Sequence, residues 1–260
     1  MPRFAANLSM LFNDVDFVAR FARAARAEFE AVEFMSPYEH DAHFLRQQLD
    51  EHQLQMILFN MPGGDRPKGD RGLGCLPHRR VEFQESVEVS IHYAQIMGSK
   101  FINCLAGIAP EGSEHAELEA TYVNNLRFVC SEAKKIGLKV VIEPLNPWDF
   151  PRFFLTRTDQ AADIVAKVGA DNLGIEYDVY HAQMAEGNLT ATVRRFLPLI
   201  WHMQVADVPT RAQPGTGEIR FDYLLRAFDQ MGYQGWIGCD YHPTTEDDSH
   251  LNWLTELNAM

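Results

Sequence analysis

The sequence alternates eight short apolar runs with stretches of helical periodicity along most of its length. The runs are rich in β-branched and aromatic residues, and several are bounded by Gly, Pro or Asn, which is typical of strands. They cover residues 3–9, 31–35, 55–60, 100–105, 139–143, 173–178, 201–206 and 235–241. Strands that alternate with helices predict parallel βαβ units, because parallel neighbours need a long crossover connection.

The stretches between these runs predict helices, because apolar residues recur at spacings of three and four and several stretches stop at a glycine. The expected helices cover residues 14–29, 41–52, 81–97, 117–136, 159–168, 189–197 and 221–231. This number of strand–helix units predicts a single (β/α)8 TIM barrel, one domain over residues 1–260. A doubly wound sheet is the alternative, but it usually needs a glycine-rich fingerprint, and Leu8-Ser9-Met10-Leu11 offers none.

Charge and composition exclude several classes of protein. The 23 basic and 36 acidic residues give a net charge of -13, whereas a nucleic-acid-binding protein needs clustered Lys and Arg. The four cysteines include no CxxC pair, and three lie in apolar or helical contexts typical of reduced core thiols. No run approaches the ~18 apolar residues of a membrane span, and the first residues lack a signal core. We therefore expect a cytoplasmic protein with no nucleic-acid or membrane partner.

Four consecutive expected strands each end in a side chain with a ligand oxygen. These side chains are Glu143, Asp178, Gln204 and Asp240. In a barrel of this kind, the C-terminal ends of the strands form the active site. Three carboxylates in one pocket repel one another, and a divalent cation would relieve that repulsion. Oxygen ligands favour Mg²⁺ or Mn²⁺ over zinc. A lone acid at a barrel rim more often binds a loop amide, but four at matching positions favour a metal site.

Two histidines and one turn carry weaker signals. His181 lies one turn after Asp178 and either holds a substrate hydroxyl or stabilises a βα loop. His202 is expected to be a core histidine. Residues 214–218 are glycine-rich but lack the lysine of a phosphate loop, so they predict a tight turn.

The segment 60–74 is long for a βα loop and carries five glycines together with Arg66, Lys68 and Arg71. Loops of this kind often close over a ligand. A basic loop on an acidic protein would suit an anionic substrate.

Motifs along nearly the whole chain carry a resemblance to a known family. They lie at residues 4–12, 69–72, 102–105, 142–146, 177–181, 202–207, 211, 214–219 and 235–239. With these motifs the chain resembles the hydroxypyruvate isomerase family, among the xylose-isomerase-like sugar isomerases and epimerases. The resemblance implies a small anionic hydroxy-oxo acid as substrate and leaves a homo-oligomer open.

The resemblance also implies roles for individual residues. Glu143 and Asp240 would form the acid/base pair and would bind the metal together with Asp178 and Gln204. His181 and Arg211 would orient the substrate, and the basic loop described above adds Arg71 as a candidate for substrate binding. The implied reaction interconverts hydroxypyruvate and 2-hydroxy-3-oxopropanoate (tartronate semialdehyde) through a cis-enediolate.

One position departs from the family pattern, because Asp240 stands where the family has Glu. The shorter side chain withdraws the carboxylate by about 1 Å, and a misplacement of that size can cost about 100-fold in rate. The metal could shift, Asp240 could keep only a ligand role, or the pocket could serve another substrate, such as a 2-oxotetronate. A ketose 3-epimerase usually has His in place of Gln204, and a nuclease of the endonuclease IV type needs more histidines. A non-catalytic binder with a decayed site is the alternative from another class.

Overall fold

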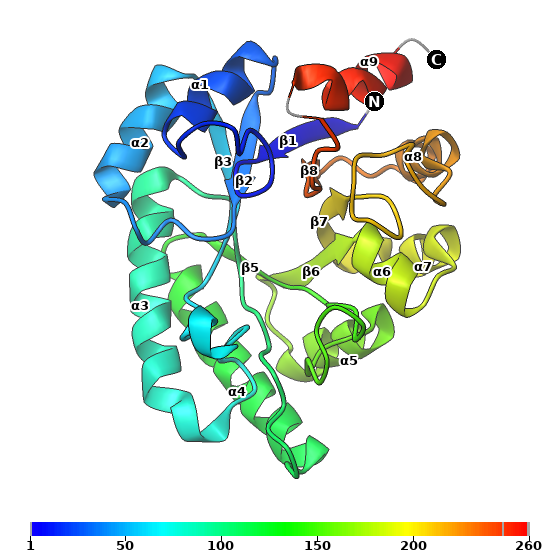
Figure 1. Cartoon of the computed structure of the whole chain (residues 1–260). Coiled ribbons are helices and arrows are strands. Elements are labelled where there is room, and N and C mark those ends of the chain that lie inside the picture. The colour runs from blue at the N-terminus through cyan, green and yellow to red at the C-terminus, as the bar shows by residue number, and fades with distance from the viewer. Residues whose placement is uncertain (1, 246, 259–260) are drawn as a thin grey trace.

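A computed structural model describes residues 2–245 and 247–258. Eight parallel strands pair in chain order and close between β8 and β1, which confirms the predicted TIM barrel (Figure 1). The strands are β1 (Arg3–Asn7), β2 (Ala31–Phe34), β3 (Gln55–Asn60), β4 (Phe101–Asn103), β5 (Lys139–Ile142), β6 (Leu173–Asp178), β7 (Ile200–Val205) and β8 (Trp236–Cys239). Each strand overlaps one predicted run. Five runs extend beyond their strands at one or both ends, two match, and β7 begins one residue before its run.

The helices surround the strands, and α9 lies beside the start of β1 (Figure 1). The α-helices are α1 (Ala19–Arg26), α2 (Ala42–Glu51), α3 (Arg80–Met97), α4 (His115–Lys134), α5 (Thr158–Val168), α6 (Val179–Ala185), α7 (Leu189–Phe196), α8 (Phe221–Gln230) and α9 (Asn252–Asn258). Short 3₁₀ helices lie at η1 (Arg66–Lys68), η2 (Pro77–Arg79), η3 (Leu197–Leu199) and η4 (Asp248–Leu251). Gly98 and Gly169 end α3 and α5 with φ angles of 69° and 71°, as their sequence positions predicted.

Three helices differ from the sequence expectation, and one of them, α9, had no predicted counterpart at the end of the chain. The helix predicted from residue 14 begins only at Ala19, because residues 14–18 form turns, in which the Ala19 N–H donates to Asp16 O at 2.9 Å. Helix α6 was not predicted, since it follows β6 with no loop between them. Asp178 ends the strand and also caps the helix, accepting the Tyr180 N–H at 2.8 Å. This direct junction places His181 at the mouth of the barrel.

The N-terminal end of the barrel interior is closed by large apolar side chains. Trp236 of β8 is buried in a cluster of strand residues there, with Trp201 of β7 packed against it. Gly174 of β6 makes room for the second ring, because a Cβ at this position would lie 2.3 Å from Trp201 Cδ2. The pocket for chemistry therefore lies at the opposite end.

All four cysteines are free and buried, in agreement with the expected thiols. No helix in the described part of the chain is long and apolar enough to span a membrane.

Candidate active site

A cavity of about 70 Å³ opens at the C-terminal ends of the strands. The residues that line it include most of the predicted site, namely Arg71, Glu143, His181, Gln204, Arg211 and Asp240. Asp178 is buried beside this cavity, within 4 Å of both His181 and Arg211. The barrel therefore brings all seven predicted residues to one end, as expected from strand ends that meet at one rim.

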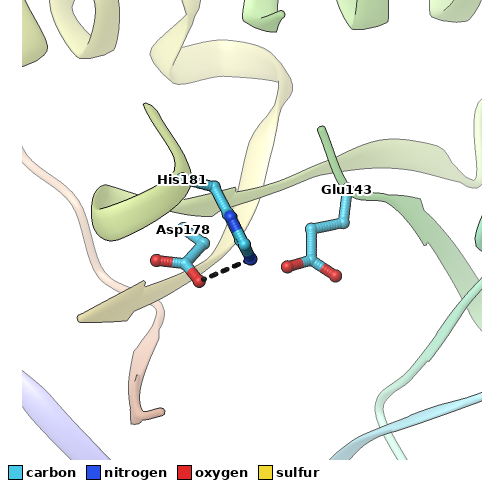
Figure 2. Close-up of side chains that lie close together, drawn as sticks. All are labelled: Glu143, Asp178 and His181. Atoms are coloured by element: carbon cyan, nitrogen blue, oxygen red, sulfur yellow. Dashed lines mark ion pairs between the residues drawn. The ribbon is translucent and has the colours of Figure 1, made fainter. Parts of the chain in front are cut away.

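Glu143, Asp178 and His181 form the tightest group of potential metal ligands. One ligand-type atom of each lies within 4.8 Å of the others, and all three residues are buried. Figure 2 shows the carboxylates of Glu143, after β5, and Asp178, at the end of β6, with the His181 ring between them. Two neighbouring strands and the helix that follows the second one thus supply the group.

Hydrogen bonds hold one oxygen of each carboxylate and leave the other available. Asn103 Nδ2 donates to Glu143 Oε2 at 2.8 Å. The Tyr180 backbone N–H donates to Asp178 Oδ1, whereas Asp178 Oδ2 is buried without a hydrogen-bond partner among the described residues. A buried carboxylate oxygen without a partner is costly, so this atom fits a position where a ligand or cation completes the site.

Burial and crowding of negative charge disfavour the ionised carboxylates. Burial raises the pKa of Glu143 well above its usual range, and the charges of Asp178 and Asp240 raise it further. Burial likewise raises the pKa of Asp178 to about 7, although the Arg211 guanidinium opposes this rise. A divalent cation would stabilise both ionised forms. The oxygen donors and the partnerless Asp178 Oδ2 fit such a cation, so the buried group could bind a metal.

The hydrogen bonds of His181 assign it a donor role. The Asn146 backbone N–H donates to Nδ1 at 3.3 Å, and Asn146 Nδ2 lies 2.8 Å from the same atom. Burial and the Arg211 cation lower the pKa of His181 well below its usual value, so the ring is neutral. With Nδ1 accepting, the proton is on Nε2, which faces Asp178 Oδ2 at 3.7 Å. This arrangement suits donation to a substrate oxygen better than metal ligation.

Gln204 is oriented by the buried carboxylate of Glu33, a residue that the sequence analysis did not identify. Gln204 Nε2 donates to Glu33 Oε1 at 2.7 Å, which leaves Gln204 Oε1 as the free ligand atom. His202 Nε2 lies 2.6 Å from Glu33 Oε2, so the expected core histidine has a buried acidic partner. The only signal for Glu33 was a charged residue inside an apolar strand. Gly238 accommodates it, since a Cβ there would lie 2.2 Å from Glu33 Oε1.

Asp240 lies in the pocket wall and is already engaged on both oxygens. Asn7 Nδ2 donates to Oδ1 at 2.8 Å, and Arg211 Nη2 binds Oδ2. Asp240 does not belong to the compact group of Glu143, Asp178 and His181. The sequence predicted that Asp240 lies at this end of β8, but it did not predict the ion pair between Asp240 and Arg211.

Arg211 bridges the acids of the site. Its Nη2 binds Asp240 and lies 3.6 Å from Asp178 Oδ2. Although burial disfavours its charge, the carboxylates of Asp240 and Asp178 raise the pKa of Arg211 above its usual value.

The loop that carries Arg211 is held by one buried carboxylate. Asp207 accepts four backbone N–H groups at 2.9–3.0 Å, from Val208, Gly215, Gly217 and Ile219. Residues 214–218 form turns and bends around this carboxylate, which confirms the predicted tight turn. Gly217 is required there, because a Cβ would lie 2.0 Å from Val208 O.

The fold and the buried site define an enzyme built on a TIM barrel. A family model described as xylose isomerase-like TIM barrel matches residues 21–257, and the chain belongs to this family. The chain is 45% identical to hydroxypyruvate isomerase of Escherichia coli K12 over 254 residues, which cover 98% of each protein. It is 43% identical, with the same coverage, to 2-oxo-tetronate isomerase of Cupriavidus necator. These relatives confirm an isomerase of the hydroxypyruvate isomerase-like group.

One solved structure is very similar to the whole barrel. It is described as an AP endonuclease of family 2 from Brucella melitensis, with a TM-score of 0.96 and 38% sequence identity. The match covers 98% of this chain and 99% of that one.

Proposed function

We propose that the protein is a metal-dependent isomerase that interconverts hydroxypyruvate and 2-hydroxy-3-oxopropanoate. The observation that carries this proposal is the buried group of Glu143, Asp178 and His181 beside the pocket. A cavity of about 70 Å³ suits a substrate of few atoms. The identity of 45% to hydroxypyruvate isomerase supports the choice of substrate.

The carboxylates of Glu143 and Asp178 would hold Mg²⁺ or Mn²⁺ together with Gln204 Oε1, in accord with the preference of these ions for oxygen ligands. Asp240 is the proposed fourth ligand, and this role requires sharing or release of the oxygen that Arg211 binds. When bound, the cation would supply charge stabilisation for the oxygens of the substrate.

Glu143 is the proposed base. It removes a proton from C3 of hydroxypyruvate, and the electrons of the C–H bond form the double bond of a cis-enediolate while the C2 oxygen becomes negative. Asn103 fixes Glu143 Oε2, so Oε1 is the oxygen that accepts the proton. Burial raises the pKa of Glu143, which opposes the lowering that a bound cation would cause.

In the second half of the reaction the electrons of the enediolate double bond take up a proton at C2. The hydroxyl on C3 loses its proton as its oxygen becomes the aldehyde carbonyl, and that proton passes to the C2 oxygen, which becomes the hydroxyl of the product. Asp240 is the proposed partner in this exchange. The Nε2–H of His181 donates to a substrate oxygen and stabilises the charge that develops there.

Metal removal tests the proposal directly. Chelation is expected to abolish turnover of hydroxypyruvate, and Mg²⁺ or Mn²⁺ to restore it, with activity followed by formation of the aldehyde. Exchange of solvent deuterium into the substrate should require the metal. Rapid exchange in the chelated protein would contradict the mechanism.

The second candidate is isomerisation of a four-carbon acid, 2-oxotetronate, which the 43% identity to 2-oxo-tetronate isomerase supports. The same residues would carry it, so a panel of three- and four-carbon oxo acids with metal present distinguishes the two substrates. Asp240→Glu separates both from a decayed binder: a decayed site gains activity, whereas a site tuned to Asp loses it.

A further inference from the structure

Two arginines of the loop between β3 and α3 line the active-site pocket without an acidic partner. Arg66 and Arg71 both contribute to its wall, and neither forms an ion pair with a described residue. The other cations of this segment are paired, since Lys68 Nζ lies 2.8 Å from Asp65 and Arg79 binds both Asp70 and Glu82. The loop thus presents two unneutralised positive charges to the pocket.

Backbone contacts hold Arg71 in place without consuming its charge. Its Nη1 donates to Arg66 O at 3.2 Å and to Asp70 O at 2.7 Å. A guanidinium has five N–H donors, so most of them remain available to an anion. Burial and the charge of Arg71 together lower the pKa of Arg66, which shows that the two cations lie close enough to repel each other. An anion between them would relieve this repulsion.

The two arginines also mark a boundary between two cavities. A second cavity of about 390 Å³ lies against the same loop and shares Met35, Asn60 and Leu105 with the inner pocket, along with both arginines. A small ligand bound by Arg66 and Arg71 therefore has its charged end at the outer edge of the inner pocket. The rest of the ligand would point toward the buried acids.

The other charged side chains of the inner pocket offer no unneutralised positive charge to a carboxylate. Glu143, Glu176 and Asp240 line it, and the first and last of these are proposed ligands of the cation. Arg211 is already engaged by Asp240 and Asp178. Among the pocket residues, only the loop arginines offer positive charge that no carboxylate neutralises.

We infer that Arg66 and Arg71 form a carboxylate subsite that binds the acid end of a small hydroxy-oxo acid, and that Arg211 instead orders the acids of the site. This inference deepens the proposed function and rests on it for the identity of the substrate. With C1 held by the arginines, C2 and C3 face Glu143, so substrates without a carboxylate lose their anchor. Three- and four-carbon acids would share this anchor, and the extra carbon would extend away from it.

Binding of glycerate, an unreactive reduced analogue of hydroxypyruvate, tests the subsite by calorimetric titration of the metal-loaded protein. Arg66→Ala and Arg71→Ala are each expected to raise the Kd by about tenfold to 100-fold, the loss expected for a hydrogen bond to a charged group. Lys68→Ala is the matched control, because it removes a charge from the same loop at a side chain that is paired with Asp65 and does not line the pocket. It should leave the Kd unchanged. Arg71→Lys keeps the charge and should bind with intermediate affinity, because it loses the planar fork.

Three results would overturn the subsite: wild-type affinity in both alanine variants, an equal loss in Lys68→Ala, or no glycerate binding by the wild-type protein. The proposed function is read separately, from turnover of hydroxypyruvate. A wild-type protein that binds glycerate through the arginines but does not convert hydroxypyruvate would refute the function and keep the subsite. A protein that converts hydroxypyruvate but binds glycerate equally well without the arginines would support the function and refute the subsite.

Discussion

The two ends of the barrel interior differ in the side chains that the same eight strands supply. At the C-terminal end, Glu143, Asp178 and Asp240 crowd around a pocket, and one buried oxygen of Asp178 has no hydrogen-bond partner among the described residues. At the N-terminal end, Trp201 and Trp236 pack into an apolar cluster. The first end concentrates charge that burial disfavours, and the second end supplies apolar burial that stabilises the fold. Chemistry and stability are therefore separated along the barrel axis.

Cations reinforce this contrast. At the N-terminal end, Arg3 lies 4.6 Å above the Trp236 ring and Lys139 lies 5.1 Å from the Trp201 ring. At the C-terminal end, Arg211 lies over the Tyr180 ring, with its Cζ 5.2 Å from the ring centroid, and also binds carboxylates. Cationic side chains thus cover aromatic surface at both ends, and at the C-terminal end Arg211 also balances buried acid.

The largest expected effect is on catalysis at the C-terminal end. Glu143→Gln removes the proposed base and should lower kcat by about 100-fold to 10,000-fold. The melting temperature of the metal-free protein should not fall, because burial disfavours the charge that the substitution removes. Steady-state kinetics and thermal unfolding measure the two effects. Near-normal turnover would remove Glu143 from the mechanism.

The next effect is on stability at the N-terminal end. Trp236→Ala removes a buried ring and should lower the free energy of unfolding by about 3–5 kcal/mol. The ratio kcat/KM, measured well below the melting temperature, should keep its wild-type value. Denaturant titration checks the first expectation. Lost activity in a protein of unchanged stability would show that the two ends are coupled.

The smallest effect lies between the two ends, where Gly238 leaves room for Glu33. Gly238→Ala should cost about 1–3 kcal/mol of stability and also lower activity, because a displaced Glu33 releases Gln204. Gly174→Ala is the matched control, since its Cβ would crowd Trp201 at the other end of the barrel. It should destabilise the protein without lowering kcat. Equal loss of activity in both variants would contradict the role of Glu33.

The sequence predicted the strands well, because each is a short apolar run with clear boundaries, and strand ends converge in a barrel. Helix α6 was not predicted, because no turn residue separates it from β6. The pair of Arg211 and Asp240 and the contact of Glu33 with Gln204 join residues far apart in the chain. Periodicity reports which face a residue occupies but not its partner across the barrel, so these contacts required the structure.

The double position of Asp178 affects how ligand-deletion experiments can be interpreted. One oxygen of this side chain starts α6, and the other faces the site. Asp178→Ala would therefore loosen the helix that carries His181 while removing a proposed ligand, and its phenotype would mix the two losses. Asp178→Asn retains an oxygen for the Tyr180 N–H and replaces the oxygen that faces the site by an uncharged NH2 group, which makes it the interpretable substitution. Because Asp178 joins β6 directly to α6, a single side chain both stabilises the start of the helix and contributes negative charge to the site.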